Sequence, residues 1–260
     1  MMVYVMENPQ KSEKLFKNFQ ETMIWSCLQK VMGEVYTNDL KAPESAAAIL
    51  GDFCFFAGKP AAELAAYKPK GCKKDFMIMI PPNEEWAALI EACYGEKAKK
   101  VTRYAIKKEP DIFLKKKCQE KLEEIVKGLS REYVMKSLDR EVFLWCKEQE
   151  WCGDWVSQYE DYGEYEKKGL GVVILKDGCL VAGASSYSSY REGIEIQIDT
   201  KQEYRRRGLA LISGAALILR CLEKGLYPSW DAQNKESVML AEKLGYHFDH
   251  EYTAYEIWGY

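Results

Sequence analysis

Apolar and polar residues alternate over a short stretch late in the chain. One face of this stretch carries Ile194, Ile196 and Ile198, and the other carries Glu195, Gln197 and Asp199. This period of two predicts a strand. Beyond Gly208 the apolar residues recur at helical spacing, and they are Leu209, Ile212, Ala216, Leu217 and Leu219. A strand followed by an apolar helix is therefore expected here.

A basic turn joins the predicted strand to the predicted helix. It reads Arg205-Arg206-Arg207-Gly208-Leu209-Ala210. The first backbone N–H groups of a helix have no partner within the helix and lie in the positive field of its dipole. Such a turn is a ready site for a phosphate or pyrophosphate group.

A second strand, turn and helix follow along the chain. Tyr227–Trp230 is expected as a strand, Asp231–Asn234 as a turn, and Ser237–Leu244 as a helix that Gly245 ends. In the first half, Asp75–Ile80, Pro81–Asn83, Glu84–Tyr94 with Gly95, and Val101–Ile106 give the same order of elements. The two blocks are either a degenerate repeat or a coincidence of order.

Other segments of the chain predict a further helix, a domain connection, a helix cap and a loop. A helix is expected over Glu13–Val31, and Asp111–Gly128 is expected to connect two domains, at residues 1–125 and 126–260. Asp139 is a predicted helix cap. Residues 154–168 are rich in Tyr and Glu and are expected to form a mobile loop or lid.

Composition limits the class of protein. The chain has 260 residues, of which 47% are hydrophobic and 30% charged, so a substantial core can form. The net charge of -3 and the absence of long apolar runs speak against nucleic-acid and membrane binding. Nine dispersed cysteines are typical of reduced thiols, and no ligand cluster predicts a metal. We expect a cytoplasmic enzyme.

The motifs resemble one known family. The spacing Arg205-x-x-Gly208-x-Ala210 and the downstream run W-D-A-x-N-x-x-S-x-x-L-A-E-K-L-G-Y are similar to the GNAT N-acetyltransferases. More narrowly, the run from Gly193 to the end resembles the zwittermicin-resistance acetyltransferases. The resemblance is strongest over Gly169–Tyr260. It implies an α/β (α+β) fold with a mixed, mostly antiparallel twisted sheet flanked by helices, preceded by a smaller α/β N-terminal domain.

The resemblance also implies a co-substrate, an acceptor and binding residues. The co-substrate is acetyl-CoA, without a metal, and the acceptor is a primary amine of a small molecule; a homodimer is possible. The implied CoA-binding residues are Ile196, Gln197, Ile198, Thr200, Arg205, Arg206, Arg207, Gly208, Leu209, Ala210, Asn234 and Ser237. Asn234 would contact the CoA arm, and Ser237 would either cap its helix or approach the thiol.

Catalytic roles are less specified by the motifs. Glu195 is the first candidate for the base that deprotonates the amine, and Asp199 is the second. Glu195 falls one residue off the usual glutamate register, which a β-bulge could restore. Ala241 stands where many relatives carry a tyrosine acid, so Tyr246, Tyr252 or Tyr255 would substitute, or the thiolate would leave unaided.

Two other functions stay open at this point. The missing tyrosine is consistent with a catalytically weak acyl-CoA sensor or scaffold. An acidic, open acceptor cleft would instead indicate a protein or peptide N-acetyltransferase. Trp145, Trp151 and Trp155 precede the expected lid, where core packing is favoured over a role in lining the acceptor pocket.

Overall fold

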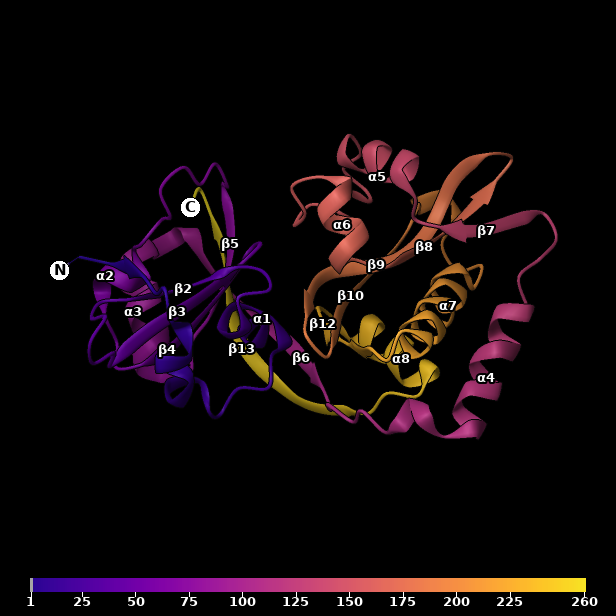
Figure 1. The fold of residues 1–260 in the computed structure, drawn as a ribbon. Coiled ribbons are helices and arrows are strands. Elements are labelled where there is room, and N and C mark those ends of the chain that lie inside the picture. The colour runs from indigo at the N-terminus through magenta and orange to yellow at the C-terminus, as the bar shows by residue number, and fades with distance from the viewer. Residues whose placement is uncertain (1) are drawn as a thin grey trace. The chain divides into compact units, whose positions relative to one another are not determined.

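The structure is a computed structural model that describes residues 2–260 (Figure 1). The chain folds into two compact units. Unit 1 comprises the chain up to Arg103 together with Glu251–Tyr260, and unit 2 comprises Tyr104–His250. Among the helices of the described residues, none is long and apolar enough to cross a membrane.

Unit 1 is built on one sheet. Its strands β1, β2, β3 and β4 pair antiparallel in chain order. β5 then pairs parallel with β4, and β13 pairs antiparallel with β5. β6 and β13 each continue from one unit into the other. The elements are β1 (Tyr4–Val5), η1 (Pro9–Phe16), α1 (Thr22–Gln29), β2 (Glu34–Thr37), β3 (Ser45–Leu50), β4 (Phe53–Gly58), α2 (Ala62–Ala65), β5 (Phe76–Ile80), α3 (Glu84–Tyr94), η2 (Gly95–Lys97), β6 (Ala98–Ile106) and β13 (Phe248–Trp258).

Unit 2 is built on a second sheet with the order β11-β10-β9-β8-β7. All its neighbours are antiparallel except β10 and β11, which are parallel. The elements are η3 (Ile112–Leu114), α4 (Lys116–Lys127), β7 (Tyr133–Ser137), α5 (Arg140–Lys147), η4 (Gly153–Trp155), α6 (Tyr162–Lys168), β8 (Gly171–Lys176), β9 (Cys179–Tyr190), β10 (Gly193–Thr200), η5 (Gln202–Tyr204), α7 (Leu209–Glu223), β11 (Tyr227–Ser229), β12 (Asp231–Ala232) and α8 (Lys235–Leu244).

Helices cover both faces of the sheet in unit 2. α7 packs across β8, β9 and β10, and its buried Leu217 and Ile218 share a core cluster with Ile194 of β10. Figure 1 shows α6 on the side of the sheet opposite to α7. The predicted mixed, mostly antiparallel sheet flanked by helices is confirmed.

Three expectations from the sequence differ from the structure. The helix expected over Glu13–Val31 is two shorter ones, η1 and α1, because the chain is extended at Glu21. The units divide at Arg103 rather than at residue 125, because α4 packs on α7 of unit 2. The expected lid is partly helical and tightly packed, and it buries Trp155, Tyr159 and Tyr165.

Trp155 lies against the sheet because β9 has a glycine beneath its ring. A Cβ at Gly183 would stand 2.6 Å from the Trp155 ring and 2.9 Å from the carbonyl oxygen of Val172. Both neighbours are rigid, so Gly183→Ala is expected to lower the free energy of unfolding by about 1–3 kcal/mol. At Gly153 a Cβ would make only an ordinary 3.7 Å contact, with the carbonyl oxygen of Cys146.

Urea unfolding of both variants tests this prediction. Gly153→Ala is the matched control and should stay within about 0.5 kcal/mol of the wild type. Equal effects of the two substitutions would show that the Trp155 ring does not depend on the small residue in β9.

Candidate active site

The predicted anion-binding turn starts α7. Gly208 is the N-cap residue with φ of +79°, and Arg206 also adopts a positive φ, of +60°. A non-glycine residue in this left-handed region is strained, and such residues gather at ligand sites. The first helical bond runs from Ile212 N–H to Gly208 O at 3.1 Å, so the N–H groups of Leu209, Ala210 and Leu211 precede it. These groups form a cradle for an anion.

Arginine side chains surround this cradle. Arg205, Arg206 and Arg207 are all exposed. Arg205 Nε donates to Thr200 O at 3.3 Å, and Arg207 Nη2 donates to Glu203 O at 3.1 Å. The Arg207 guanidinium also stacks over the Tyr204 ring, 5.0 Å from its centroid. The cradle is therefore cationic, and two of its three arginines are oriented by backbone carbonyls.

Strands β10 and β11 part beside the cradle. They pair in parallel at only three positions, Gly193–Tyr227, Ile194–Pro228 and Glu195–Ser229. β10 continues to Thr200 while paired with β9 on its other side. Its edge from Ile196 to Thr200 therefore faces no other strand of the sheet among the described residues. An open edge offers backbone N–H and C=O groups to an extended ligand.

Glu195 lies at the point of parting. Its side chain is 5% exposed, and its Cα partners are Ser188 on β9 and Ser229 on β11. The expected bulge is beside it, but the extra residue, Tyr187, lies on β9, so the register of β10 itself is unbroken. The Glu195 carboxylate is close enough to Tyr227 to add to the rise of its pKa to about 12, which burial mainly causes.

Asp199, the second candidate base, is held by two neutral donors. Trp155 Nε1 and Gln197 Nε2 each donate to Asp199 Oδ2 at 2.9 Å. Burial raises the pKa of this carboxyl above its usual value, and the two hydrogen bonds only partly oppose the rise. Asp199 thus fastens Trp155 of η4 to β10, and Gln197 orients the Asp199 carboxyl.

The raised pKa of Asp199 predicts a pH-dependent stability. A carboxyl whose pKa is higher in the folded than in the unfolded state stabilises the fold. This contribution is largest below the unfolded-state pKa of about 3.9. That contribution is lost as pH rises through the raised native pKa. In Asp199→Asn this part of the pH dependence disappears.

Denaturant titration at several pH values measures this effect. The free energy of unfolding of the wild type, minus that of Asp199→Asn, should fall as pH rises across that window and then level off. A difference that grows with pH would contradict the burial of this carboxyl as the cause.

Tyr246 is not placed as a catalytic acid would be. Its ring is 2% exposed, and its hydroxyl donates to Pro228 O at 2.7 Å. Phe113 and Trp230 pack edge-on against it at 4.7 and 5.6 Å. This geometry supports a packing role and gives the predicted catalytic role no support. The other two candidates, Tyr252 and Tyr255, belong to unit 1.

The start of α8 shows which of its two polar residues is the cap. Asn234 Oδ1 accepts the N–H of Ser237 at 2.9 Å, so Asn234 caps the helix, and the capping alternative for Ser237 is wrong. Asn83 caps α3 in the same way, by accepting Trp86 N–H at 3.0 Å. Ala241 is fully buried and carries only a methyl group, so α8 offers no hydroxyl at that position.

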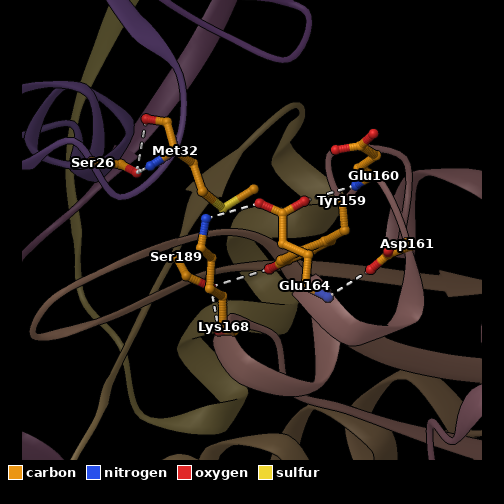
Figure 2. A network of polar contacts seen from close by, with 8 residues as sticks. All are labelled: Ser26, Met32, Tyr159, Glu160, Asp161, Glu164, Lys168 and Ser189. Carbon is orange, nitrogen blue, oxygen red and sulfur yellow. Dashed lines mark hydrogen bonds and ion pairs between the residues drawn. The ribbon is translucent and has the colours of Figure 1, made fainter.

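A hydroxyl network that the sequence did not reveal holds the expected lid on β9. Tyr159 bonds Ser186 at 2.8 Å and Ser189 at 3.1 Å, and Ser189 donates to Lys168 O at 2.7 Å. Figure 2 shows Tyr159, Ser189 and Lys168 in this arrangement, with Glu164 beside them. The signal that could have found it is the run Ser185-Ser186-Tyr187-Ser188-Ser189, together with the tyrosines of residues 154–168.

The same segment is strongly acidic. Residues 148–166 contain seven Asp and Glu side chains and no Lys or Arg. Most of these carboxylates are exposed. Because Trp155 of this segment bonds Asp199, the acidic surface belongs to a segment that is packed on the strand carrying Glu195.

Comparisons with known proteins agree with this geometry. The model of the GNAT acetyltransferase family matches residues 13–255. The uncharacterized N-acetyltransferase YdfB of Bacillus subtilis (strain 168) is 27% identical over 250 residues, which are 90% of this chain and 89% of that protein. The crystal structure of a GCN5-related N-acetyltransferase-like protein from Streptococcus suis 89/1591 is 42% identical and superposes with a TM-score of 0.89, over 96% of this chain and 98% of that one.

A more distant structure shares the fold alone. The tandem GNAT protein from the clavulanic acid biosynthesis pathway has a TM-score of 0.55 at 9% identity, over 100% of this chain and 99% of that one. The family model covers both units of the present chain. This chain belongs to the GNAT acetyltransferase family and is a transferase enzyme.

Proposed function

We propose that this enzyme transfers an acetyl group from acetyl-CoA directly to a primary amine of a small molecule. The observation that carries the proposal is the parting of β10 and β11 beyond Glu195, next to the N-terminus of α7. The open edge of β10 thereby begins at a buried carboxylate and ends at Thr200, whose carbonyl oxygen accepts a hydrogen bond from Arg205 of the cradle.

The residues present fit acetyl-CoA. Gly208, Leu209 and Ala210 would hold the pyrophosphate through backbone N–H groups, with Arg205, Arg206 and Arg207 adding positive charge. The open edge from Ile196 to Thr200 would pair with the pantetheine arm. The buried Thr200 Oγ1 has no hydrogen-bond partner within the described part of the chain, which suits a ligand contact. The bound thioester would supply the activated acetyl group.

Glu195 would remove the proton from the amine. An ammonium group has no lone pair for attack, so a base must take its proton directly or through one water. Glu195 is the carboxylate at the point of parting, whereas Asp199 is already engaged by Trp155 and Gln197. A backbone N–H on the open edge would stabilise negative charge developing on the carbonyl oxygen.

The acidic surface of residues 148–166 supports a cationic acceptor. Carboxylates raise the local concentration of ammonium groups and steer them toward a site. A free metabolite or antibiotic that carries several amines fits this charge, in line with the resemblance to zwittermicin-resistance acetyltransferases. A peptide or protein amine fits it as well, and this is the second candidate function that a specific observation favours.

Unit 1 would not bind a second CoA. Its strands β1–β5 repeat the pairing pattern of β7–β11, and we propose that it is a degenerate copy of the same core. The element after β4 is α2, which has four residues against fifteen in α7. Pro60 just before α2 has no N–H to offer an anion. Unit 1 would then be a scaffold.

Calorimetric titration with acetyl-CoA, followed by an amine screen, tests the proposal. Turnover is best monitored by the loss of thioester absorbance, because a thiol reagent would also react with the exposed Cys93 and Cys179. Binding with turnover of free amines supports the proposal, and turnover of peptide amines alone favours the second candidate. Binding without any turnover indicates a sensor, and no binding overturns the cofactor assignment.

The expected cytoplasmic location and the possible homodimer are carried into this proposal from the sequence. Light scattering coupled to size-exclusion chromatography tests the second of these expectations directly.

A further inference from the structure

Ser229 has a buried hydroxyl with an unused hydrogen bond. It is the last residue of β11 and is fully buried. Across the residues that the structure describes, no donor or acceptor is bonded to Ser229 Oγ. Buried polar groups in proteins are nearly always paired, so each exception requires an explanation. Alanine would fill nearly the same space without the cost of an unpaired hydroxyl.

The position of Ser229 supplies that explanation. Its Cα partner across the parallel pair is Glu195, and this is the final pair before the two strands part. Residues directly opposite each other in a sheet point to the same face. The Ser229 hydroxyl therefore lies on the face of the proposed base, at the closed end of the opened edge of β10.

A hydrogen-bond donor at this place could act on the acetyl group, and α8 provides no hydroxyl for that role. Ala241 provides no hydroxyl, and the Tyr246 hydroxyl is bonded to Pro228 O. The acetyl group must meet the amine beside Glu195, since the base has to reach the amine proton. A hydroxyl next to that base would face the acetyl carbonyl oxygen, which accepts hydrogen bonds far better than a thioester sulfur.

We propose that the Ser229 hydroxyl donates a hydrogen bond to the carbonyl oxygen of the bound acyl thioester. This inference rests on the proposed function. It assigns Ser229 to the reaction as a second donor beside the backbone N–H of the open edge, and it accounts for a fully buried serine hydroxyl that has no partner among the described residues.

Binding of acetyl-CoA and of CoA to Ser229→Ala tests the inference. The wild type should bind acetyl-CoA in preference to CoA, which has no carbonyl at this position. In Ser229→Ala the Kd for acetyl-CoA should rise about fivefold, as expected for one lost hydrogen bond, while the Kd for CoA stays the same. With a working amine, kcat should fall about 100-fold, as for loss of one donor to a developing oxyanion.

Ser185→Ala is the matched control. Ser185 is also a fully buried serine of the same sheet, but its hydroxyl bonds Tyr165 OH and Trp155 O, each at 2.8 Å. Ser185→Ala should lower Tm and leave the preference for acetyl-CoA unchanged. Ser229→Ala should leave the Tm of the free protein unchanged or raised. In infrared spectra, the carbonyl band of bound, isotope-labelled acetyl-CoA should shift to higher frequency in Ser229→Ala only.

The outcomes separate this inference from the proposed function. If the wild type does not bind acetyl-CoA, the proposed function fails, and the inference falls with it. If the wild type binds but Ser229→Ala keeps the preference for acetyl-CoA and the carbonyl band, the inference alone is overturned. A marked loss of Tm in free Ser229→Ala would also overturn it, because the hydroxyl would then have a partner in the protein.

Discussion

Glu195→Gln is expected to lower kcat by about 10²- to 10⁴-fold, which is the range for loss of a positioned general base. Glutamine has nearly the same shape as glutamate but accepts no proton at neutral pH. The Glu195 residue is 5% exposed, and its side chain contacts no part of CoA in the proposed mode of binding. The Kd for acetyl-CoA should therefore change by less than about twofold. Steady-state kinetics and calorimetry of the same preparation measure both quantities.

Asp199→Asn is the matched control for that prediction. Its carboxylate already accepts hydrogen bonds from Trp155 and Gln197, and asparagine can accept them through its amide oxygen. We therefore expect a far smaller change in kcat than for Glu195→Gln. The opposite order, with Asp199→Asn nearly inactive and Glu195→Gln active, would move the base along β10 toward the cradle.

The distinction between these two acids depends on contacts that no local pattern contains. The alternation along β10 placed Glu195 and Asp199 on one face, and both were candidates for the base. Glu195 is buried because β11 pairs with β10 at that residue, and Asp199 is engaged because η4 brings Trp155 to it. Both partners are distant in sequence, so no local pattern shows that Asp199 is the carboxylate bonded by Trp155.

Local turn chemistry, in contrast, was sufficient for several elements. The predicted helix Glu84–Tyr94 has exactly the bounds of α3, since Asn83 caps its start and Gly95 follows its end. Asp139 caps α5 as expected, by accepting Val142 N–H at 3.0 Å. These signals act within one turn of the chain, so they do not depend on tertiary context.

The errors share a physical cause. The unit boundary was misplaced because α4 packs on α7, a helix far along the chain. The expected lid was judged mobile from its Tyr and Glu content, yet Tyr159 and Tyr165 use their hydroxyls to bond buried serines of β9. Polar residues are solvent-exposed only when the fold brings them no hydrogen-bond partner, and composition does not show whether it does.

The turn at Gly208 was predictable in place but not in its geometry. The motif located the turn, and the structure adds that both Arg206 and Gly208 have positive φ. A Cβ at Gly208 would meet no atom within 4 Å, so a side chain there has room and projects from an exposed turn. The consequences of a substitution at this residue are therefore set by backbone strain and charge rather than by a clash.

Gly208→Glu is expected to weaken acetyl-CoA binding by at least about 100-fold. A carboxylate at the start of α7 would take up the positive field of the helix end and repel the pyrophosphate. Gly208→Ala adds only the strain of a left-handed residue, about 1–2 kcal/mol, and should weaken binding less than about tenfold. Calorimetric titration of the two variants separates strain from charge.

Gly225→Glu completes the comparison. Gly225 also has a positive φ, of +68°, and open space around its missing Cβ, but it follows the C-terminal end of α7. The same charge and the same strain are thereby introduced at the other end of one helix, where the dipole disfavours a carboxylate, so the general loss of stability should be at least that of Gly208→Glu. Acetyl-CoA binding that survives in Gly225→Glu and is lost in Gly208→Glu would place the phosphates on the N-terminal cradle. Equal losses in both variants would mean that α7 responds as a whole and that the cradle does not hold the ligand.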